Sequence, residues 1–302
     1  MRPIDLDHNA TTPVDPDVLA AMLPFLREDF GNPSSAHAAG RRAHDAVETA
    51  RAEVAALIGA RADEIIHAQN EVGTLQPLAE IARAAHAKGA LMHADAAQSV
   101  GKAPVDVAAL GLDLLTVAGH KLYAPKGIGV LYMRRGLDLP PLIVGAGQEH
   151  GRRPGTENVA GIVALGEACR LARLRLERGT QELAALARDL LARLQREVPG
   201  LVLVGHPTDR LPNTLNVLFP GVSGRRVLDA CPGVLASTGS ACHADREDPS
   251  SILLALGIDP QAALGAVRLS LGYATSRDDI EAAATRLSEA WRMVACVPAN
   301  AT

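Results

Sequence analysis

The sequence has 302 residues and a net charge of −4, and 48% of its residues are hydrophobic although only 2% are aromatic. This length allows a large buried core and predicts one larger and one smaller domain. The charge balance offers no basic surface for nucleic acid, and no apolar run is long enough to span a membrane. The four cysteines form no CxxC pair and no metal-ligand spacing, which indicates a reducing cytoplasm, and Asp5 and Asp7 occupy the region where an export signal would be apolar.

The first 58 residues predict an extended segment followed by two helices. Residues 1–15 have an extended pattern, and Asp15-Pro16 places an N-cap before a proline at the first helical position, which predicts a helix over residues 16–27. The turn-forming sequence GNPSS at 31–35 separates it from a second helix over residues 36–58. The apolar face of this second helix is formed by Val47, Ala50, Val54 and Leu57.

Strands and helices alternate in the next part of the chain. Short apolar runs predict strands over residues 63–66, 90–94, 114–117 and 130–133, with helices over 77–88 and 105–110. Gly89 follows the first of these helices in the position of a left-handed C-cap. This order is typical of a mainly parallel sheet covered by helices, which is the α/β class.

The second half of the chain predicts a long helix and a smaller α+β domain. A glycine-rich loop, GAGQEHGRRPGTEN at 145–158, leads into a helical region over 157–196 with a break near Gly179. Strands are then predicted over 201–204, 214–219, 234–236 and 267–271, with helices starting near 223, near 249 and near 278. We therefore expect a large domain over residues 1–160, with the option that residues 1–15 pack on the small domain, and a linking helix plus small domain over residues 161–302.

Two strand ends carry the strongest functional signal. Lys121 follows one apolar run in AGHK, and Asp95 follows another in HADAAQ, so both stand at the carboxyl end of a strand, where α/β proteins bind ligands. Poor solvation lowers the pKa of a lysine there and makes its amine available for a Schiff base. An aspartate nearby suits the ring nitrogen of pyridoxal 5′-phosphate (PLP). Taken singly, Lys121 would be a solvated surface residue and Asp95 a helix N-cap, but the combination favours a cofactor site.

Five motifs, HADAAQ, AGHK, RRPGTEN, STGSAC and VRLSLG, occur in this order after the opening segments LDHNATTPVDP and FGNPSSAHAAGRRA. With them the chain, from about Ile4 to Trp291, resembles the NifS/IscS-like cysteine desulfurases of the class V aminotransferase family. The resemblance implies fold type I of the PLP-dependent transferases, a homodimer, and removal of sulfur from L-cysteine. The products would be alanine and an enzyme-bound persulfide for iron–sulfur cluster or thio-cofactor assembly, with a sulfur-acceptor scaffold protein as a further partner.

The resemblance also implies which residues bind the cofactor. They are Asn70, Asp95, Gln98, His120, Lys121 and Thr156. Lys121 would bind PLP covalently and move protons at the substrate Cα, while Asp95 would keep the ring nitrogen protonated. Gln98 and Asn70 would contact the ring oxygen. His120 and Thr156 would contact the phosphate, Thr156 that of the neighbouring subunit; taken from the sequence alone, Thr156 is equally an N-cap.

Cys242, in the small-residue loop STGSAC, is the candidate nucleophile. It would attack the sulfur of the bound cysteine as a thiolate, which His243 or Arg246 would favour. A buried, inert thiol is the alternative, and it is the interpretation of Cys169, Cys231 and Cys296. The resemblance implies that Arg268, in VRLSLG, and Asn32 bind the substrate, Arg268 through the carboxylate; a salt bridge is the other interpretation of Arg268.

The family pattern is interrupted between about Ile66 and His67. Family members have here a Ser/Gly/Thr-rich turn that binds the PLP phosphate and a histidine that stacks on the ring. In this sequence HAQNEVGTLQP follows Ile66 directly, and Ala118 stands where the family has a hydroxyl residue. A block close to a quarter of the usual chain is missing, either as a natural deletion or because it was left out of the sequence. His67 is a conceivable stacking substitute, although an incidental histidine is the simpler interpretation.

Two other functions stay open. One is a different PLP-dependent transamination or lyase reaction that does not use Cys242. The other is a non-catalytic deletion remnant that serves as a binding scaffold for a sulfur-acceptor protein, because the phosphate turn and the stacking histidine are missing.

Overall fold

The structure is a computed structural model that describes residues 3–35, 37–59, 72–238 and 248–296. The contacts within the chain divide it into two compact units. We call residues 12–69 and 77–176 the central unit, and residues 1–11, 70–76 and 177–302 the terminal unit. The domain bounds 1–160 and 161–302 stay a prediction, which the assignment of residues 1–11 to the terminal unit supports for the N-terminal segment.

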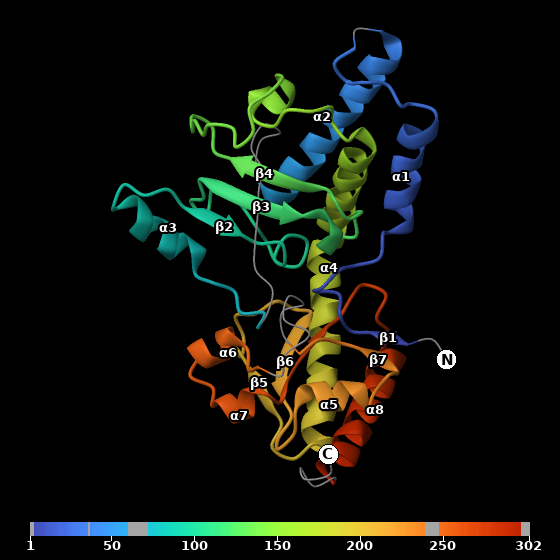
Figure 1. The fold of residues 1–302 in the computed structure, drawn as a ribbon, viewed down its shortest axis with the longest axis vertical. Helices are drawn as coiled ribbons and strands as arrows, with labels where there is room; N and C mark the ends of the chain where they lie inside the picture. The colour runs from blue at the N-terminus through green and yellow to red at the C-terminus, as the bar shows by residue number, and fades with distance from the viewer. Residues whose placement is uncertain (1–2, 36, 60–71, 239–247, 297–302) are drawn as a thin grey trace. The chain divides into compact units, whose positions relative to one another are not determined.

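The central unit is built on a three-stranded sheet with the order β2-β3-β4 (Figure 1). Its strands are β2 (His93–Asp95), β3 (Leu114–Ala118) and β4 (Gly129–Met133), of which β2 and β3 are parallel and β4 is antiparallel to β3. Its helices are α1 (Pro16–Arg27), α2 (Ala38–Ile58), α3 (Leu78–His86) and the first part of α4 (Val159–Glu197). The predicted α/β class is confirmed.

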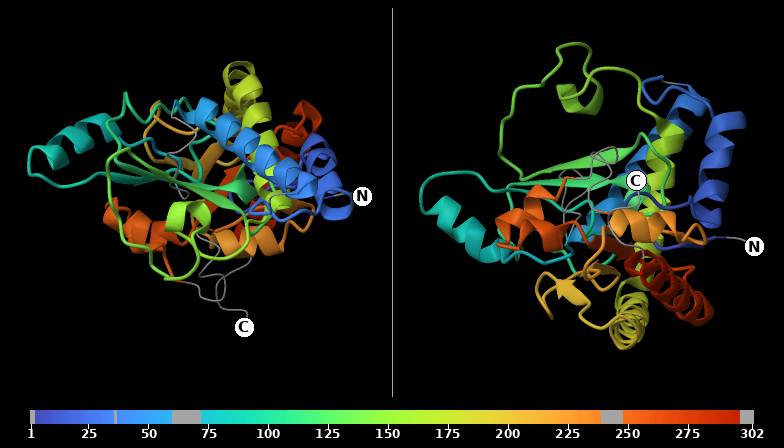
Figure 2. Two further views of the ribbon diagram at one scale, coloured as in Figure 1. Left: turned by 90° about the horizontal axis from the view of Figure 1, so that it is seen from above. Right: turned by 60° about the horizontal axis from the view of Figure 1, so that its bottom comes forward.

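One face of this sheet is covered by helices, and the other, which we call the open face, carries side chains of β2 that are exposed. Along β3 the side chains alternate, so that Leu115 and Val117 are buried whereas Leu114 and Thr116 are half-buried. The buried side chains join one core cluster with Val54 and Ile58 of α2 and with Ala164 and Ala168 of α4. Figures 1 and 2 show these two helices beside the sheet. The open face, which carries Asp95 and His93, is therefore the side from which a ligand can reach the strand ends.

The terminal unit has an antiparallel sheet with the order β5-β6-β8. Its strands are β5 (Val202–Val204), β6 (Thr214–Leu218) and β8 (Ala266–Ser270), and a separate parallel pair joins β1 (Ile4–Asp5) to β7 (Val234–Leu235). Its helices are the end of α4, α5 (Gly224–Asp229), α6 (Ser251–Ala255), α7 (Pro260–Ala263) and α8 (Arg277–Ala295). One face of the sheet packs Leu215, Val217, Val267 and Leu269 into a core with Leu190 of α4 and Ile280 of α8.

Several helix boundaries follow the sequence signals. The carboxylate of Asp15 accepts a hydrogen bond from Asp17 N at 3.0 Å, so the predicted N-cap of α1 is confirmed. Val47, Ala50, Val54 and Leu57 are all buried, as the amphipathic pattern of α2 predicts. Gly89 adopts a left-handed conformation with φ of 70°. Within the described residues, no helix is both long and apolar enough to cross a membrane.

Three predictions about elements are wrong. Residues 107–111 form a turn rather than a helix, because Asp106 accepts from Ala109 N and left-handed Gly111 ends the turn. α4 continues through Gly179 without a break, since the cost of about 1 kcal/mol for a helical glycine is outweighed by buried leucines on both sides of it, Leu171 and Leu183. The strand expected over 90–94 begins only at His93.

Candidate functional site

Asp95 and Lys121 stand at the same edge of the central sheet. Asp95 ends β2 and pairs in register with Thr116 of β3, and Lys121 lies in the short 3-10 helix η1 (Gly119–Lys121) that directly follows β3. Gly119 makes this turn possible, because a Cβ at that position would lie 2.8 Å from the carbonyl oxygen of Ile128. The chain therefore turns sharply at the end of β3 and places the lysine beside the end of the neighbouring strand.

The segment before α1 holds the lysine turn in place. Thr12 accepts from Tyr123 N at 2.9 Å through its hydroxyl, and that hydroxyl donates to the carbonyl oxygen of His120 at 3.0 Å. The backbone N–H of Thr12 donates to the same carbonyl at 2.9 Å, and Asp15 N donates to Tyr123 O at 3.1 Å. Tyr123 itself has a left-handed backbone with φ of 65°, a conformation that a tyrosine keeps only where its surroundings enforce it.

Two features of its surroundings lower the pKa of His120. Burial lowers the pKa of its imidazole below the usual 6.5, and the neighbouring ammonium groups of Lys121 and Lys126 lower it further. The ring is therefore neutral at pH 7. A neutral imidazole can donate one hydrogen bond to a phosphate, but it brings no positive charge.

The carboxylate of Asp95 is exposed on the open face of the sheet and accepts a long hydrogen bond of 3.4 Å from Ala97 N. On the same face His93 Nε2 lies 3.0 Å from the hydroxyl of Thr116. Because Asp95 and His93 are two residues apart on one strand, their side chains point to the same side. The open face thus presents an acid and an imidazole next to the lysine turn.

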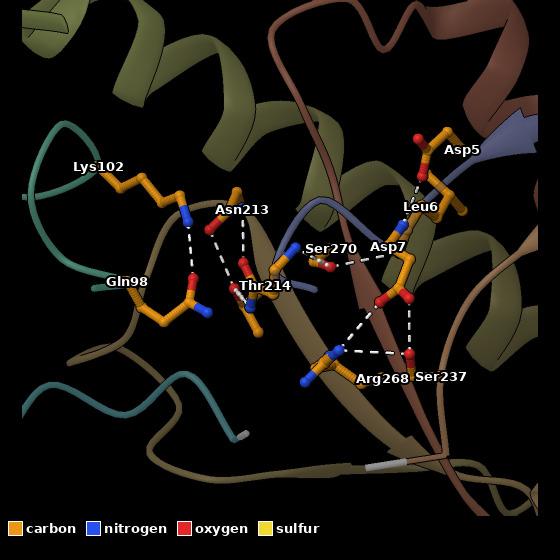
Figure 3. Close-up of polar contacts among 11 residues, drawn as sticks. Asp5, Leu6, Asp7, Gln98, Lys102, Asn213, Thr214, Ser237, Arg268 and Ser270 are labelled. Carbon is orange, nitrogen blue, oxygen red and sulfur yellow. Dashed lines mark hydrogen bonds and ion pairs between the residues drawn. The ribbon is translucent and has the colours of Figure 1, made fainter. Parts of the chain in front are cut away.

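Gln98 is fully buried and its amide is engaged within the central unit. Lys102 donates to Gln98 Oε1 at 2.8 Å, and Lys102 is itself only 6% exposed (Figure 3). Because the ammonium group occupies the oxygen end of the amide, the side chain of Gln98 turns its nitrogen end, a donor, away from Lys102. A donor is the group that a ring oxygen of PLP would require.

Thr156 and Asn32 lie in exposed loops, and the prediction of Thr156 as an N-cap is wrong, because α4 begins at Val159 and Asn158 Oδ1 accepts from Gly161 N at 3.1 Å. The guanidinium of Arg153 donates to the carbonyl oxygens of Gly155 at 3.0 Å and of Thr156 at 3.4 Å, which shapes the backbone around Thr156. Asn32 Oδ1 accepts from Ser34 N at 2.9 Å and so stabilises the predicted turn. A cavity of about 460 Å³ lies between α2, β4 and the loop of residues 149–158, but neither Asp95 nor Lys121 lines it.

Arg268 lies buried in β8 of the terminal unit. Its Nη2 donates to Asp7 Oδ1 at 3.0 Å and to the hydroxyl of Ser237 at 3.3 Å, and that hydroxyl donates to Asp7 Oδ2 at 2.7 Å (Figure 3). Its side chain is 1% exposed, so the ion pair with Asp7 neutralises a charge that would be costly to bury alone. The two acceptors on one nitrogen fix the plane of the guanidinium.

The four cysteines and Asn70 differ in whether the structure describes them and in whether they are buried. Asn70 and Cys242 lie outside the residues that the structure describes. Cys169 and Cys231 are buried, as predicted, and burial raises the pKa of both thiols. The same prediction is wrong for Cys296, which is exposed because it caps the carboxyl end of α8.

Four supporting residues were not identified from the sequence: Asp7, Thr12, Lys102 and Ser237. Only Lys102 had a local signal, since it follows Gln98 by four residues, the spacing of neighbours on one helical turn. The contact between Thr12 and His120 joins residues 108 positions apart, and that between Asp7 and Arg268 joins residues 261 apart. Such pairs leave no pattern in a sequence window.

The described residues fit the ring of PLP. A lysine and an exposed carboxylate at one sheet edge match an aldehyde and a protonated ring nitrogen. For the phosphate the described residues offer His120 and Thr156, whereas Ala118 contributes no hydroxyl. The residues that would hold the group are therefore Asp95, Gln98, His120, Lys121 and Thr156.

Comparison with known proteins gives a consistent result. The family model "Aminotransferase class-V" matches residues 4–70 and 65–283. The "Cysteine desulfurase IscS" of Dictyoglomus turgidum is 33% identical over 362 aligned residues, covering 92% of this chain and 92% of that protein. The "Cysteine desulfurase NifS" of Azotobacter vinelandii is 34% identical over 364, covering 93% and 90%.

Solved structures agree with these relatives. A "NIFS-LIKE PROTEIN" superposes with a TM-score of 0.88 at 27% identity, covering 96% of this chain and 100% of that one. A NifS-like protein from Rickettsia africae superposes with a TM-score of 0.87 at 26% identity, again covering 96% and 100%.

The comparisons also locate the missing block. The two stretches that the family model matches meet at residues 65–70, where the sequence departs from the family pattern. An alignment of 362 residues is longer than this 302-residue chain, so the Dictyoglomus protein has residues without a counterpart here. The prediction of an absent internal block is confirmed.

Proposed function

Because this chain belongs to the class-V aminotransferase family, we infer that it is a PLP-dependent cysteine desulfurase, which removes sulfur from L-cysteine and passes it on as a persulfide. One observation carries the inference. In a chain whose curated relatives are cysteine desulfurases, Lys121 and Asp95 follow adjacent parallel strands and stand at one edge of the sheet.

PLP, when bound, supplies a ring that accepts electrons released at the substrate Cα. Lys121 Nζ would remove and return the proton at this carbon, and the carboxylate of Asp95 would hold the proton on the ring nitrogen. Gln98, whose Oε1 accepts from Lys102, would donate to the ring oxygen through its amide nitrogen. His120 would donate to the phosphate, and in a homodimer Thr156 would reach the phosphate of the neighbouring subunit.

The sulfur transfer step is assigned to Cys242, with Arg268 and Asn32 holding the substrate. The thiolate attacks the sulfur of the substrate, a sulfur–sulfur bond forms, and the carbon–sulfur bond breaks with its electron pair left on carbon. Protonation of that carbon yields alanine, and the sulfur stays on Cys242 as a persulfide. A sulfur-acceptor protein in the cytoplasm would take it for iron–sulfur cluster or thio-cofactor assembly.

The test begins with the protein mixed with PLP and treated with borohydride, followed by peptide mass mapping. We expect the reduced cofactor on Lys121 and none in Lys121→Ala, with Lys126→Ala as the matched control because Lys126 is an exposed lysine five residues away. Cys242→Ser should keep the cofactor absorbance and lose sulfide release from L-cysteine. Retained sulfide release in Cys242→Ser would point instead to a lyase or transaminase that does not use this thiol.

A second candidate is a non-catalytic binding scaffold, and the break of the family match at residues 65–70 favours it. Its expected result is a protein that stays colourless with added PLP and yet binds a sulfur-acceptor protein. The intact mass decides beforehand whether the block is absent from the natural chain, since the sequence corresponds to 31.5 kDa.

A further inference from the structure

Asn216 is a buried amide in the middle of the terminal sheet whose polar atoms are unused. It lies in β6, is fully buried, and within the described residues neither Nδ2 nor Oδ1 has a hydrogen-bond partner. An amide has four hydrogen-bonding positions, and burial without partners costs folding free energy. Buried groups of this kind usually have a hydrogen-bond partner in the protein or in ordered water, so an exception calls for an explanation.

Two neighbouring buried hydroxyl groups, those of Thr214 and Ser270, have hydrogen-bond partners within the protein. Two residues before Asn216, the hydroxyl of Thr214 accepts from Asn9 Nδ2 at 2.8 Å and donates to Asn213 Oδ1 at 2.9 Å. The hydroxyl of Ser270 accepts from Asn9 N at 2.9 Å. These two hydroxyl groups are therefore paired within the protein, whereas among the described residues the amide of Asn216 is not.

The sheet register places Asn216 directly beside Arg268. Asn216 pairs with Val204 of β5 on one side and with Arg268 of β8 on the other, and Ser237 bridges to Arg268 on its far side. Residues opposite each other in an antiparallel pair project from the same face, with Cβ atoms about 4.5–5.5 Å apart. A single row across the sheet thus runs from an aliphatic residue to an amide, to a guanidinium and to a hydroxyl.

An amide and a guanidinium at this spacing are complementary to a carboxylate. A carboxylate offers about four lone-pair positions on two oxygens, so it can accept from Arg268 and from Asn216 Nδ2 together, with charge-assisted bonds. Asp7 and Ser237 accept from Nη2 and so hold the guanidinium in one position.

We propose that Asn216 binds the substrate carboxylate together with Arg268. This rests on the proposed function for the identity of the substrate as an α-amino acid, and Asn216 then adds a binding residue to that reaction. The unused amide then gains its partner when substrate is bound.

The test uses L-alanine as the probe, because it carries the α-carboxylate and has no sulfur to react. Isothermal titration is carried out on the full chain with and without PLP. Asn216→Leu should bind L-alanine about 10- to 100-fold more weakly, the loss expected for one hydrogen bond to a charged group. The same variant should unfold at an equal or higher temperature, because its leucine joins the cluster that contains Val204 and Leu218.

Ser288→Ala is the matched control, since the hydroxyl of Ser288 is also buried in the terminal unit without a partner among the described residues. Its L-alanine affinity should equal that of the unaltered protein. If Asn216→Leu does not fold, Asn216→Asp is measured instead. It should also bind L-alanine more weakly, because the introduced carboxylate can pair with Arg268 and repel the carboxylate of L-alanine.

The proposal is overturned if the unaltered protein fails to bind L-alanine in either condition, or if a folded Asn216 variant binds it as tightly as the unaltered protein. A rise in the KM for L-cysteine with little change in kcat supports it. Failure of the proposed function is a separate result: no sulfide is released from L-cysteine, while the alanine titration still reports on Asn216.

Discussion

Asp113 joins three elements of the central unit through one buried carboxylate. Its Oδ2 accepts from Met92 N at 2.8 Å and lies 2.7 Å from His86 Nε2 of α3, while its Oδ1 accepts from Arg134 Nε at 2.7 Å. Its side chain is 2% exposed, whereas those of His86 and Arg134 are 43% and 52% exposed. Asp113 precedes β3, so it anchors the strand that leads to Lys121.

We expect Asp113→Asn to lower the free energy of unfolding by about 3 kcal/mol. The bond from Met92 N loses its charged acceptor, which is worth about 1.5–3 kcal/mol. The bonds to His86 and Arg134 contribute about 0.5 kcal/mol each, because both partners regain water when released. For a unit of this size the loss corresponds to a fall in the unfolding midpoint of about 6–12 °C.

The effect should depend on pH with a defined sign. Burial raises the pKa of Asp113, but the hydrogen bonds from Met92, His86 and Arg134 outweigh it and hold the pKa below the usual 3.8. A carboxylate with a lowered pKa stabilises the fold above its unfolded pKa and loses that contribution as the pH falls through its folded pKa. The gap between the unaltered protein and Asp113→Asn should thus be constant above about pH 5 and narrow below pH 3.8.

Thermal unfolding followed by circular dichroism between pH 3 and pH 8 measures this gap. Asp138→Asn is the matched control, because Asp138 is exposed, and it should shift the midpoint by no more than about 2 °C. The reasoning would be refuted by an Asp113→Asn midpoint within the range of this control at pH 7, or by a gap that persists unchanged at pH 3.

Three further predictions concern the lysine turn and the thiols. Thr12→Val should cost about 1–2 kcal/mol of stability and weaken PLP binding, because Tyr123 N loses its partner and His120 O keeps only the bond from Thr12 N; equal PLP affinity in a spectroscopic titration would contradict this. The pKa of the His120 imidazole, measured by NMR, should lie below 6.5 and should rise towards 6.5 in Lys126→Gln. Because the unfolded chain binds this proton at a higher pH than the folded chain, the free energy of unfolding should fall as the pH drops below 6.5. A measured pKa of His120 at or above 6.5 would contradict this prediction. Native alkylation should label Cys296 but not Cys169 or Cys231, whose thiol pKa values burial raises, so equal labelling of Cys169 and Cys296 would be inconsistent with the structure.

Local signals in the sequence predict most of the fold. The N-cap at Asp15, the apolar face of α2 and the glycine at position 89 depend on neighbours within a few residues, so a short window contains them. The two wrong helix predictions share a limitation: the spacing of apolar residues contains no information on the contacts that decide them. A hydrogen bond to the side chain of Asp106 forms the turn at 107–111. Packing of α4 on both sides of Gly179 keeps that helix continuous.

The candidate site was predictable where it depends on strand ends. Lys121 and Asp95 could be placed together because parallel strands end at the same edge of a sheet. The residues that hold the site side chains in place were not predictable, because they are distant in the sequence. Thr12 and His120 are 108 positions apart, and Asp7 and Arg268 are 261 positions apart. Asn216 was missed for a different reason: its lack of a partner is a property of three-dimensional burial and has no counterpart in residue type or spacing.

The chain keeps a buried core in each unit although the block is missing. Each unit keeps a contiguous cluster of buried side chains, one around Leu115 with α2 and α4 and one around Leu269 with α4 and α8, so each can bury enough apolar surface to fold. The phosphate of PLP is in a different situation. Of the contacts proposed for it, His120 is neutral because its pKa is lowered, and Thr156 is a neutral hydroxyl, so neither balances the charge of a phosphate. On the proposed function, retention of the cofactor therefore depends chiefly on the bond to Lys121 and on the ion pair between Asp95 and the ring nitrogen.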